Sequence, residues 1–298
     1  MIINKTIFDS IFDECLDIIH SSSDKAILNK EEKLNKAYKK LVENNDNELQ
    51  EFYSIVHELR TYHFLKTKGL SVTAQNDNKK GPDFYCEELG YIECVSVTRG
   101  EKGTECRKYV EKCLARKSFR FLAALPRITS VITDKKKKFE DYLSQKTIDS
   151  QVPRIITINT SVFSNLVCGD LMLDLVLQIL YGAGNQVLWV SRNPISFIDE
   201  GEGVETHRYN DKGYKQDNLE LDLAYFEKEE YQNISAIILV KNAITERDIE
   251  NNYIIFTNPL ANVPINVERL RAFNVMVQRS KDDNMIRYEI LKANRLSE

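Results

Sequence analysis

The chain of 298 residues is long enough to bury a substantial hydrophobic core, as one large domain or two small ones. Its 42% apolar and 29% charged residues exclude a disordered or fibrous protein. The formal net charge of −4 does not by itself indicate a nucleic-acid binder. No apolar run in the sequence is long enough to predict a membrane-crossing helix.

The segment at the start of the chain, MIINKTIFDSIFDE, does not have the pattern of a secretory signal. Acidic residues interrupt its apolar stretch, and no small-residue cleavage site follows. We therefore expect a cytoplasmic protein. None of the six cysteines has a partner at CxxC spacing, so we expect free, mostly buried thiols rather than a structural zinc site.

Helices are predicted for the first part of the chain. Apolar residues at helical spacing indicate an amphipathic helix within residues 1–45, with a second helix over Glu31–Val42. A long helix is predicted over Glu48–Thr67, ending at Gly69. Three short segments then have strand composition: LSVTAQ, DFYCEE and YIECVSVT, the last two joined around Leu89 and Gly90.

Helices and strands alternate in the rest of the chain. The predicted elements are a basic helical stretch at 101–122, a break at Pro126, a helix over Ile128–Leu143, a buried strand within 154–163, an apolar helix over Cys168–Leu180, strands at 186–190, 235–240 and 253–258, and a partly helical C-terminal tail. This order predicts an α/β fold with a mixed central sheet flanked by helices. We divide the chain into a helical N-terminal extension, 1–47, and a single α/β domain, 48–298, with a polar insertion around 199–233.

Positive charge is concentrated in one part of this acidic protein. Between Arg99 and Lys138 there are thirteen Lys and Arg residues and four acids, a local charge of +9. Such a block indicates a site for a polyanion. Solvated helix faces are the alternative explanation.

Two carboxylates lie close together in the predicted hairpin. Asp83 follows a Gly-Pro turn at the start of one strand, and Glu93 lies ten residues later in the next strand. Neighbouring antiparallel strands can bring two such side chains together, and converging carboxylates bind Mg²⁺. Alternatively, Asp83 only caps a turn. An acid such as Glu93 within an apolar strand requires a metal or an ion pair.

The stretch GPDFYCEELGYIECVSV resembles the PD-(D/E)xK nuclease superfamily. Pro82 and Asp83 match the first element of its motif, Glu93 matches the acid of the second, and Glu58 could match the upstream helical Glu. The resemblance covers residues 48–160, about a third of the chain. It implies a restriction-endonuclease-like core and hydrolysis of phosphodiester bonds with Mg²⁺ or Mn²⁺, in DNA rather than RNA.

The roles of the site residues follow from this resemblance. Asp83 and Glu93 would hold the metal, with the carbonyl of Cys94, and Glu58 would orient a metal-bound water. A homodimer is a possible assembly, because cutting both strands of DNA often requires two copies. Alternatively, Glu58 is a surface helix residue. His57 and His63, on the same helix, are expected to pack in the core or on the surface.

The lysine of the family motif is missing from its usual place, which is occupied by Val95. The helix after Pro126 offers a substitute. At about 100° per residue, Lys135 falls near the middle of the apolar stripe, Lys136 and Lys138 toward its flanks, and Lys137 away from it. A lysine facing a core is costly unless it meets a carboxylate, so Lys135 is the candidate catalytic lysine. The alternative is a side chain that reaches past the core to solvent.

Further basic residues are predicted to contact phosphates of the nucleic acid: Arg99, Lys102, Arg107, Lys108, Arg127 and Lys136. Each alone could be an ordinary exposed charge. Two functions remain open. One is a metal-dependent endonuclease. The other is a catalytically inactive nuclease-like domain that binds nucleic acid or another protein, and Val95 at the lysine position favours it.

Overall fold

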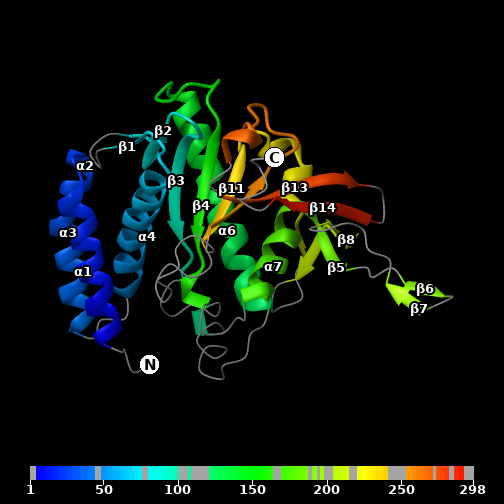
Figure 1. Cartoon of the computed structure of the whole chain (residues 1–298), viewed down its shortest axis with the longest axis horizontal. Coiled ribbons are helices and arrows are strands. Elements are labelled where there is room, and N and C mark those ends of the chain that lie inside the picture. Colours follow the sequence, from blue (N-terminus) through cyan, green and yellow to red (C-terminus); the bar gives the residue numbers. More distant parts are fainter. Residues whose placement is uncertain are drawn as a thin grey trace.

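The computed structural model describes residues 5–43, 48–75, 80–98, 100, 107–108, 121–163, 169–186, 190–192, 195–197, 204–214, 220–240, 253–270, 273–281 and 285–291. Within these ranges the protein is a mixed α/β structure, in which a large mixed sheet is flanked by helices (Figure 1). This confirms the fold class predicted from the sequence at that level. No helix among these residues has the length and apolarity that a membrane span requires.

The N-terminal helices lie on one side of the sheet, on the left of Figure 1. They are α1 (Lys5–Ser21), α2 (Lys25–Leu28), α3 (Lys30–Val42) and α4 (Glu48–Thr67). Asp24 caps α2, because one of its carboxylate oxygens accepts a hydrogen bond from the Ala26 amide at 2.9 Å. Its other oxygen accepts from the Ala74 amide at 2.8 Å, which ties the helices to the edge of the sheet. The long helix has the bounds predicted from the sequence.

Ten strands form the main sheet of the described residues. In spatial order they are β1 (Val72–Ala74), β2 (Phe84–Cys86), β3 (Gly90–Ser96), β4 (Arg154–Asn159), β11 (Ala236–Val240), β12 (Tyr253–Thr257), β13 (Asn274–Lys281), β14 (Met285–Leu291), β8 (Val204–Tyr209) and β5 (Ala183–Gln186). β1, β2 and β3 form an antiparallel meander, whereas β3, β4 and β11 are parallel. The connection from β3 to β4 therefore crosses the sheet and contains α6 (Phe121–Ser144).

Two hydrophobic cores cover the two faces of this sheet. Side chains alternate along β4, so that Ile155 packs with α1, α3 and α4, whereas Ile156 and Ile158 pack with α6 and α7 (Gly169–Tyr181). The same alternation holds in β3, where Ile92 and Cys94 belong to the first core. The sheet is thus buried on both sides around β3 and β4. A charged side chain in these strands therefore needs a partner of opposite charge.

Short elements complete the described structure. β6 (Val190–Arg192) pairs with β7 (Ile195–Phe197), and β9 (Lys212–Tyr214) pairs with β10 (Glu220–Asp222). Short 3₁₀ helices cover Ser161–Phe163, Tyr225–Glu227, Glu229–Tyr231 and Val267–Leu270. Within the segment 199–233, β8 lies between β14 and β5 in the main sheet. The proposed division into an extension and one domain with an insertion stays a prediction.

Two predictions about secondary structure were wrong. The C-terminal tail forms β13 and β14 rather than a helix, because the buried Ile286 and Tyr288 flank the exposed Arg287 with the two-residue period of a strand. Pro126 does not end a helix but lies inside α6, near its start, where the missing N–H removes one intrahelical hydrogen bond. Most of the basic stretch at 101–122 lies outside the described residues.

Candidate active site

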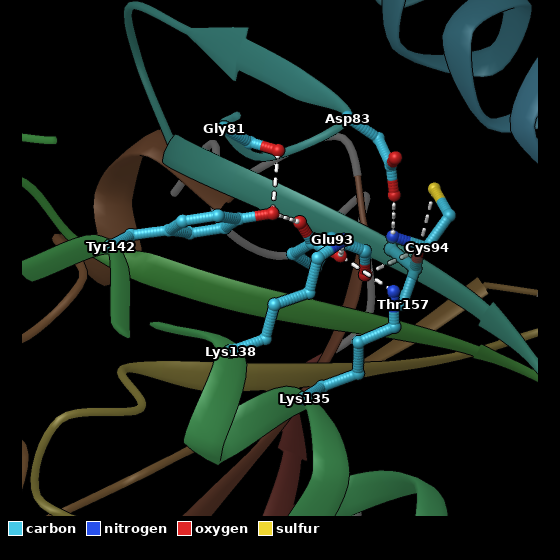
Figure 2. Close-up of polar contacts among 8 residues, drawn as sticks. All are labelled: Gly81, Asp83, Glu93, Cys94, Lys135, Lys138, Tyr142 and Thr157. Carbon is cyan, nitrogen blue, oxygen red and sulfur yellow. Dashed lines mark hydrogen bonds and ion pairs between the residues drawn. The ribbon is translucent and has the colours of Figure 1, made fainter. Parts of the chain in front are cut away.

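The β2–β3 hairpin brings the two predicted carboxylates together. Phe84 pairs with Ile92, so Asp83, just before β2, lies across from Glu93. A carboxylate oxygen of Asp83 accepts a hydrogen bond from the Cys94 amide at 2.6 Å (Figure 2). Gly90 closes the turn with a φ of 106°, and a Cβ at this position would clash with the carbonyl oxygen of Pro153. Glycine is therefore required at the turn that positions the pair.

Glu93 is fully buried, with 0% of its surface exposed, and it is held by three side chains of α6 (Figure 2). Lys135 Nζ lies 2.5 Å from Glu93 Oε2, and Lys138 Nζ lies 2.9 Å from the same oxygen. The hydroxyl of Tyr142 lies 2.9 Å from Glu93 Oε1. The spacing of three and then four residues places these groups on one face of the helix. The predicted lysine thus meets the predicted carboxylate.

Tyr142 connects Glu93 to the loop before β2. Its hydroxyl lies 2.7 Å from the carbonyl oxygen of Gly81, so its single proton serves two acceptors. Burial and the nearby charge of Glu93 raise the pKa of Tyr142, which keeps the hydroxyl protonated at neutral pH. Tyr142 therefore acts as a donor that fixes the orientation of the Glu93 carboxylate.

The environment of Asp83 disfavours the negative charge of its carboxylate. Burial, followed by the charges of Glu93 and Glu58, raises the pKa of Asp83 to about 7. The positive charge of Lys135 and the hydrogen bond from the Cys94 amide act in the opposite direction, but they do not outweigh these effects. The negative charges of Glu93 and Glu58 therefore repel a charged Asp83 carboxylate, and Lys135 does not fully offset them. A cation beside Asp83 would reduce this repulsion.

The raised pKa of Asp83 makes the stability of the protein depend on pH. The folded protein binds this proton more tightly than the unfolded chain, in which an Asp titrates near about 4, so Asp83 contributes stability at low pH that is lost as the pH rises through about 7. Asp83→Asn keeps an acceptor for the Cys94 amide and carries no charge. We expect its advantage in unfolding free energy over the wild type to grow across this pH range. Urea denaturation with a chelator present tests this, and parallel pH profiles of the two proteins would contradict it.

Glu58 approaches the site but has a different partner. Lys30 Nζ of α3 lies 2.5 Å from Glu58 Oε2, while the charge of Glu58 still acts on Asp83. In the part of the chain that the structure describes, no three His, Cys, Asp or Glu side chains are arranged to hold a metal together. A divalent ion bound by Asp83 and Glu93 would complete its coordination with backbone carbonyl groups and water, as Mg²⁺ commonly does.

His57 is a buried histidine next to the site. It is 1% exposed, and among the described atoms neither ring nitrogen has a hydrogen-bond partner. Burial, followed by the positive charge of Lys135, lowers the pKa of His57 to about 3. Its ring is therefore neutral at physiological pH, in keeping with the packing role expected from the sequence.

The structure describes only some of the basic residues that were predicted to contact phosphates. Arg99 and Lys102 lie outside the described residues, Arg107 is 5% exposed, and Lys108 is exposed. Arg127 donates hydrogen bonds to the carbonyl and hydroxyl oxygens of Thr98 at 2.9 and 2.6 Å, which favours a structural role for its side chain.

Lys136 has partners away from the Glu93 carboxylate. Its Nζ lies 3.1 Å from Glu140 Oε1 and 5.4 Å from the centre of the Tyr231 ring. It therefore does not share the position of Lys135 and Lys138. Its contact with nucleic acid stays a prediction.

Val95 and Cys94 contribute apolar packing around the site. Val95, at the motif position of the missing lysine, packs against the core on the side of α6. The Cys94 thiol is buried and accepts a hydrogen bond from the Thr157 hydroxyl at 3.0 Å. Cys15, Cys86 and Cys94 are all free and buried, as predicted for the cysteines that the structure describes.

Sequence reasoning missed the contributions of Lys138 and Tyr142. The helical period places Lys138 only at the flank of the apolar stripe, and a tyrosine such as Tyr142 fits the same stripe as an ordinary core residue. Their spacing from Lys135 was the available signal, because all three lie on one helix face. Searches of protein-family models, of curated proteins and of solved structures found nothing that matches this chain.

Proposed function

We propose that this protein is a metal-dependent nuclease that hydrolyses phosphodiester bonds, with DNA the preferred substrate. The observation that carries the proposal is the contact between Lys135 Nζ and the buried Glu93 carboxylate, across from Asp83. Burying a lysine and two acids around one point is costly. Clusters of this kind, with a strongly shifted pKa, occur preferentially at functional sites.

A restriction-endonuclease-like core is part of the proposal. It is supported by the order of elements around the site, in which α4, the β1–β3 meander, α6 and β4 follow one another along the chain. The three acids of the PD-(D/E)xK pattern come from α4 and from the hairpin, and the relocated lysine comes from α6. The short sequence motif and this arrangement support the same assignment.

The residues present suit Mg²⁺ or Mn²⁺. Carboxylate oxygens are the ligands that these ions prefer, and the pKa of Asp83 is raised by burial and by neighbouring negative charge. Asp83 and Glu93 would hold the ion, with the carbonyl of Cys94. Such an ion supplies positive charge at a phosphate and makes water a better nucleophile near neutral pH.

The residues of the chain would have distinct roles in hydrolysis. Water forms a new bond to phosphorus, the bond from phosphorus to the bridging oxygen breaks, and that oxygen gains a proton. Lys135, as an ammonium group beside Glu93, would position the water and stabilise the negative charge that develops on the phosphate. Tyr142 keeps Glu93 oriented, and Glu58, held by Lys30, contributes negative charge next to Asp83.

A second candidate function is a nuclease-like domain that binds nucleic acid without cutting it. Val95 favours it, since an apolar side chain occupies the motif position of the lysine. The two candidates differ in whether Lys135 replaces that lysine in function.

The deciding experiment is cleavage of plasmid DNA and of single-stranded RNA with Mg²⁺ or Mn²⁺. We expect the wild type to cut one of these substrates only when metal is present. Asp83→Asn should lower the rate at least about a hundredfold, because it removes a charge that holds the ion while it keeps the hydrogen bond from Cys94. If the wild type cuts neither substrate with either metal, the binding function is favoured instead.

A further inference from the structure

Two lysines share one carboxylate oxygen at the centre of the site. Lys135 and Lys138 both direct their ammonium groups to Glu93 Oε2, at 2.5 and 2.9 Å (Figure 2). Oε2 therefore accepts from two ammonium groups, and it keeps a cationic donor when one of them turns away.

The two lysines differ in their access to solvent. The side chain of Lys135 is 17% exposed, whereas that of Lys138 is 43% exposed. Lys138 is therefore the lysine that a ligand approaching from solvent can reach.

Glu93 does not depend on Lys138 to remain in place. If Lys138 moves away, Oε2 keeps the ammonium group of Lys135 and Oε1 keeps the hydroxyl of Tyr142. The other contact of this head group is a cation–π approach, in which Nζ lies 5.6 Å from the centre of the Tyr142 ring, one turn along the helix. The head group can thus turn toward solvent without dismantling the site.

We propose that Lys138 is a substrate-binding residue that leaves Glu93 and contacts a backbone phosphate of the nucleic acid beside the site. Lys135 remains bound to Glu93. Lys138 would thus bind the substrate, while Lys135 would act at the reaction centre. This inference rests on the proposed function for its substrate class, nucleic acid. It requires binding only, and therefore does not require that the protein cut its substrate.

The helix supplies a matched control. Lys137 has the same charge and is adjacent in sequence, but it is exposed and faces away from the apolar stripe that carries the site. Lys137→Met and Lys138→Met change the net charge equally. A difference between them therefore reports on position rather than on charge.

The test is binding of a fluorescently labelled DNA duplex, followed by anisotropy at several salt concentrations with EDTA present. We expect Lys138→Met to weaken binding about tenfold, and the slope of log K against log salt to become smaller by about 1, as for the loss of one phosphate contact. Lys138→Arg should retain most of the affinity, and Lys137→Met should bind nearly as the wild type does. Urea denaturation verifies that each variant is folded.

The outcomes separate this inference from the proposed function. If the wild type binds DNA, and Lys138→Met weakens binding in the predicted way, the inference holds even when no metal supports cleavage. If the wild type cuts DNA and Lys138→Met binds and cuts as Lys137→Met does, the inference is overturned while the nuclease function stands. Absence of DNA binding by the wild type would overturn the inference as well.

Discussion

Lys135→Met is expected to lower the rate of phosphodiester cleavage about a hundredfold to a thousandfold, equivalent to roughly 3–4 kcal/mol of the reaction barrier. The substitution removes the ammonium group that lies 2.5 Å from Glu93 and keeps a side chain of similar length. Single-turnover cleavage rates, measured with saturating enzyme and Mg²⁺, check this result. The effect should fall on the rate of the chemical step and only weakly on substrate affinity.

The control for this prediction is Lys137→Met, which removes the same charge from the exposed side of α6. It should cut at nearly the wild-type rate. The fold of Lys135→Met should persist, because Lys138 and Tyr142 still contact the Glu93 carboxylate. A folded Lys135→Met variant with most of its activity would show that Lys135 does not replace the lysine of the motif.

Glu93→Gln is expected to lower the free energy of unfolding by about 3 kcal/mol, since it leaves the largely enclosed ammonium group of Lys135 without a carboxylate. The amide has the shape of the carboxylate, so the loss reflects charge rather than a cavity. Urea denaturation at neutral pH with a chelator measures it. A cost below about 0.5 kcal/mol, as is typical of a surface substitution, would contradict the prediction.

A double variant identifies the source of this cost. In Glu93→Gln with Lys135→Met, neither member of the pair is charged, and we expect part of the stability to return. If the two single costs simply add, the ion pair is not what stabilises this part of the fold. The experiment does not depend on catalysis and therefore tests the geometry of the site alone.

The position of Lys135 beside Glu93 could be predicted because a helix has a fixed period. Lys135 falls within the buried face of α6, which six residues define: Ile128, Val131, Ile132, Phe139, Tyr142 and Leu143. The partnership of Asp83 with Glu93 was also predictable, since a short turn joins the two strands. Both predictions rest on local geometry, which the sequence encodes directly.

Contacts between distant segments could not be predicted in this way. The pairing of Lys30 with Glu58 depends on how α3 packs against α4, and no local pattern determines which lysine meets which acid. Likewise, the parallel pairing of β4 with β3 on one side and with β11 on the other joins segments far apart in the sequence. The order of strands in a sheet follows from the packing of the whole domain, which a single sequence does not display.

The alternation of side chains along β3 limits how the sequence of this protein can change. Ile92 and Cys94 face the core of α4, while Glu93 contacts the residues of α6 on the opposite face. One residue inserted between Gly90 and Glu93 would turn the carboxylate into an apolar core and an isoleucine or a cysteine toward the lysines. An insertion of two residues would restore the faces. Related sequences can therefore lengthen β3 only by an even number of residues. An insertion of a single residue would disrupt the site and destabilise the sheet at the same time.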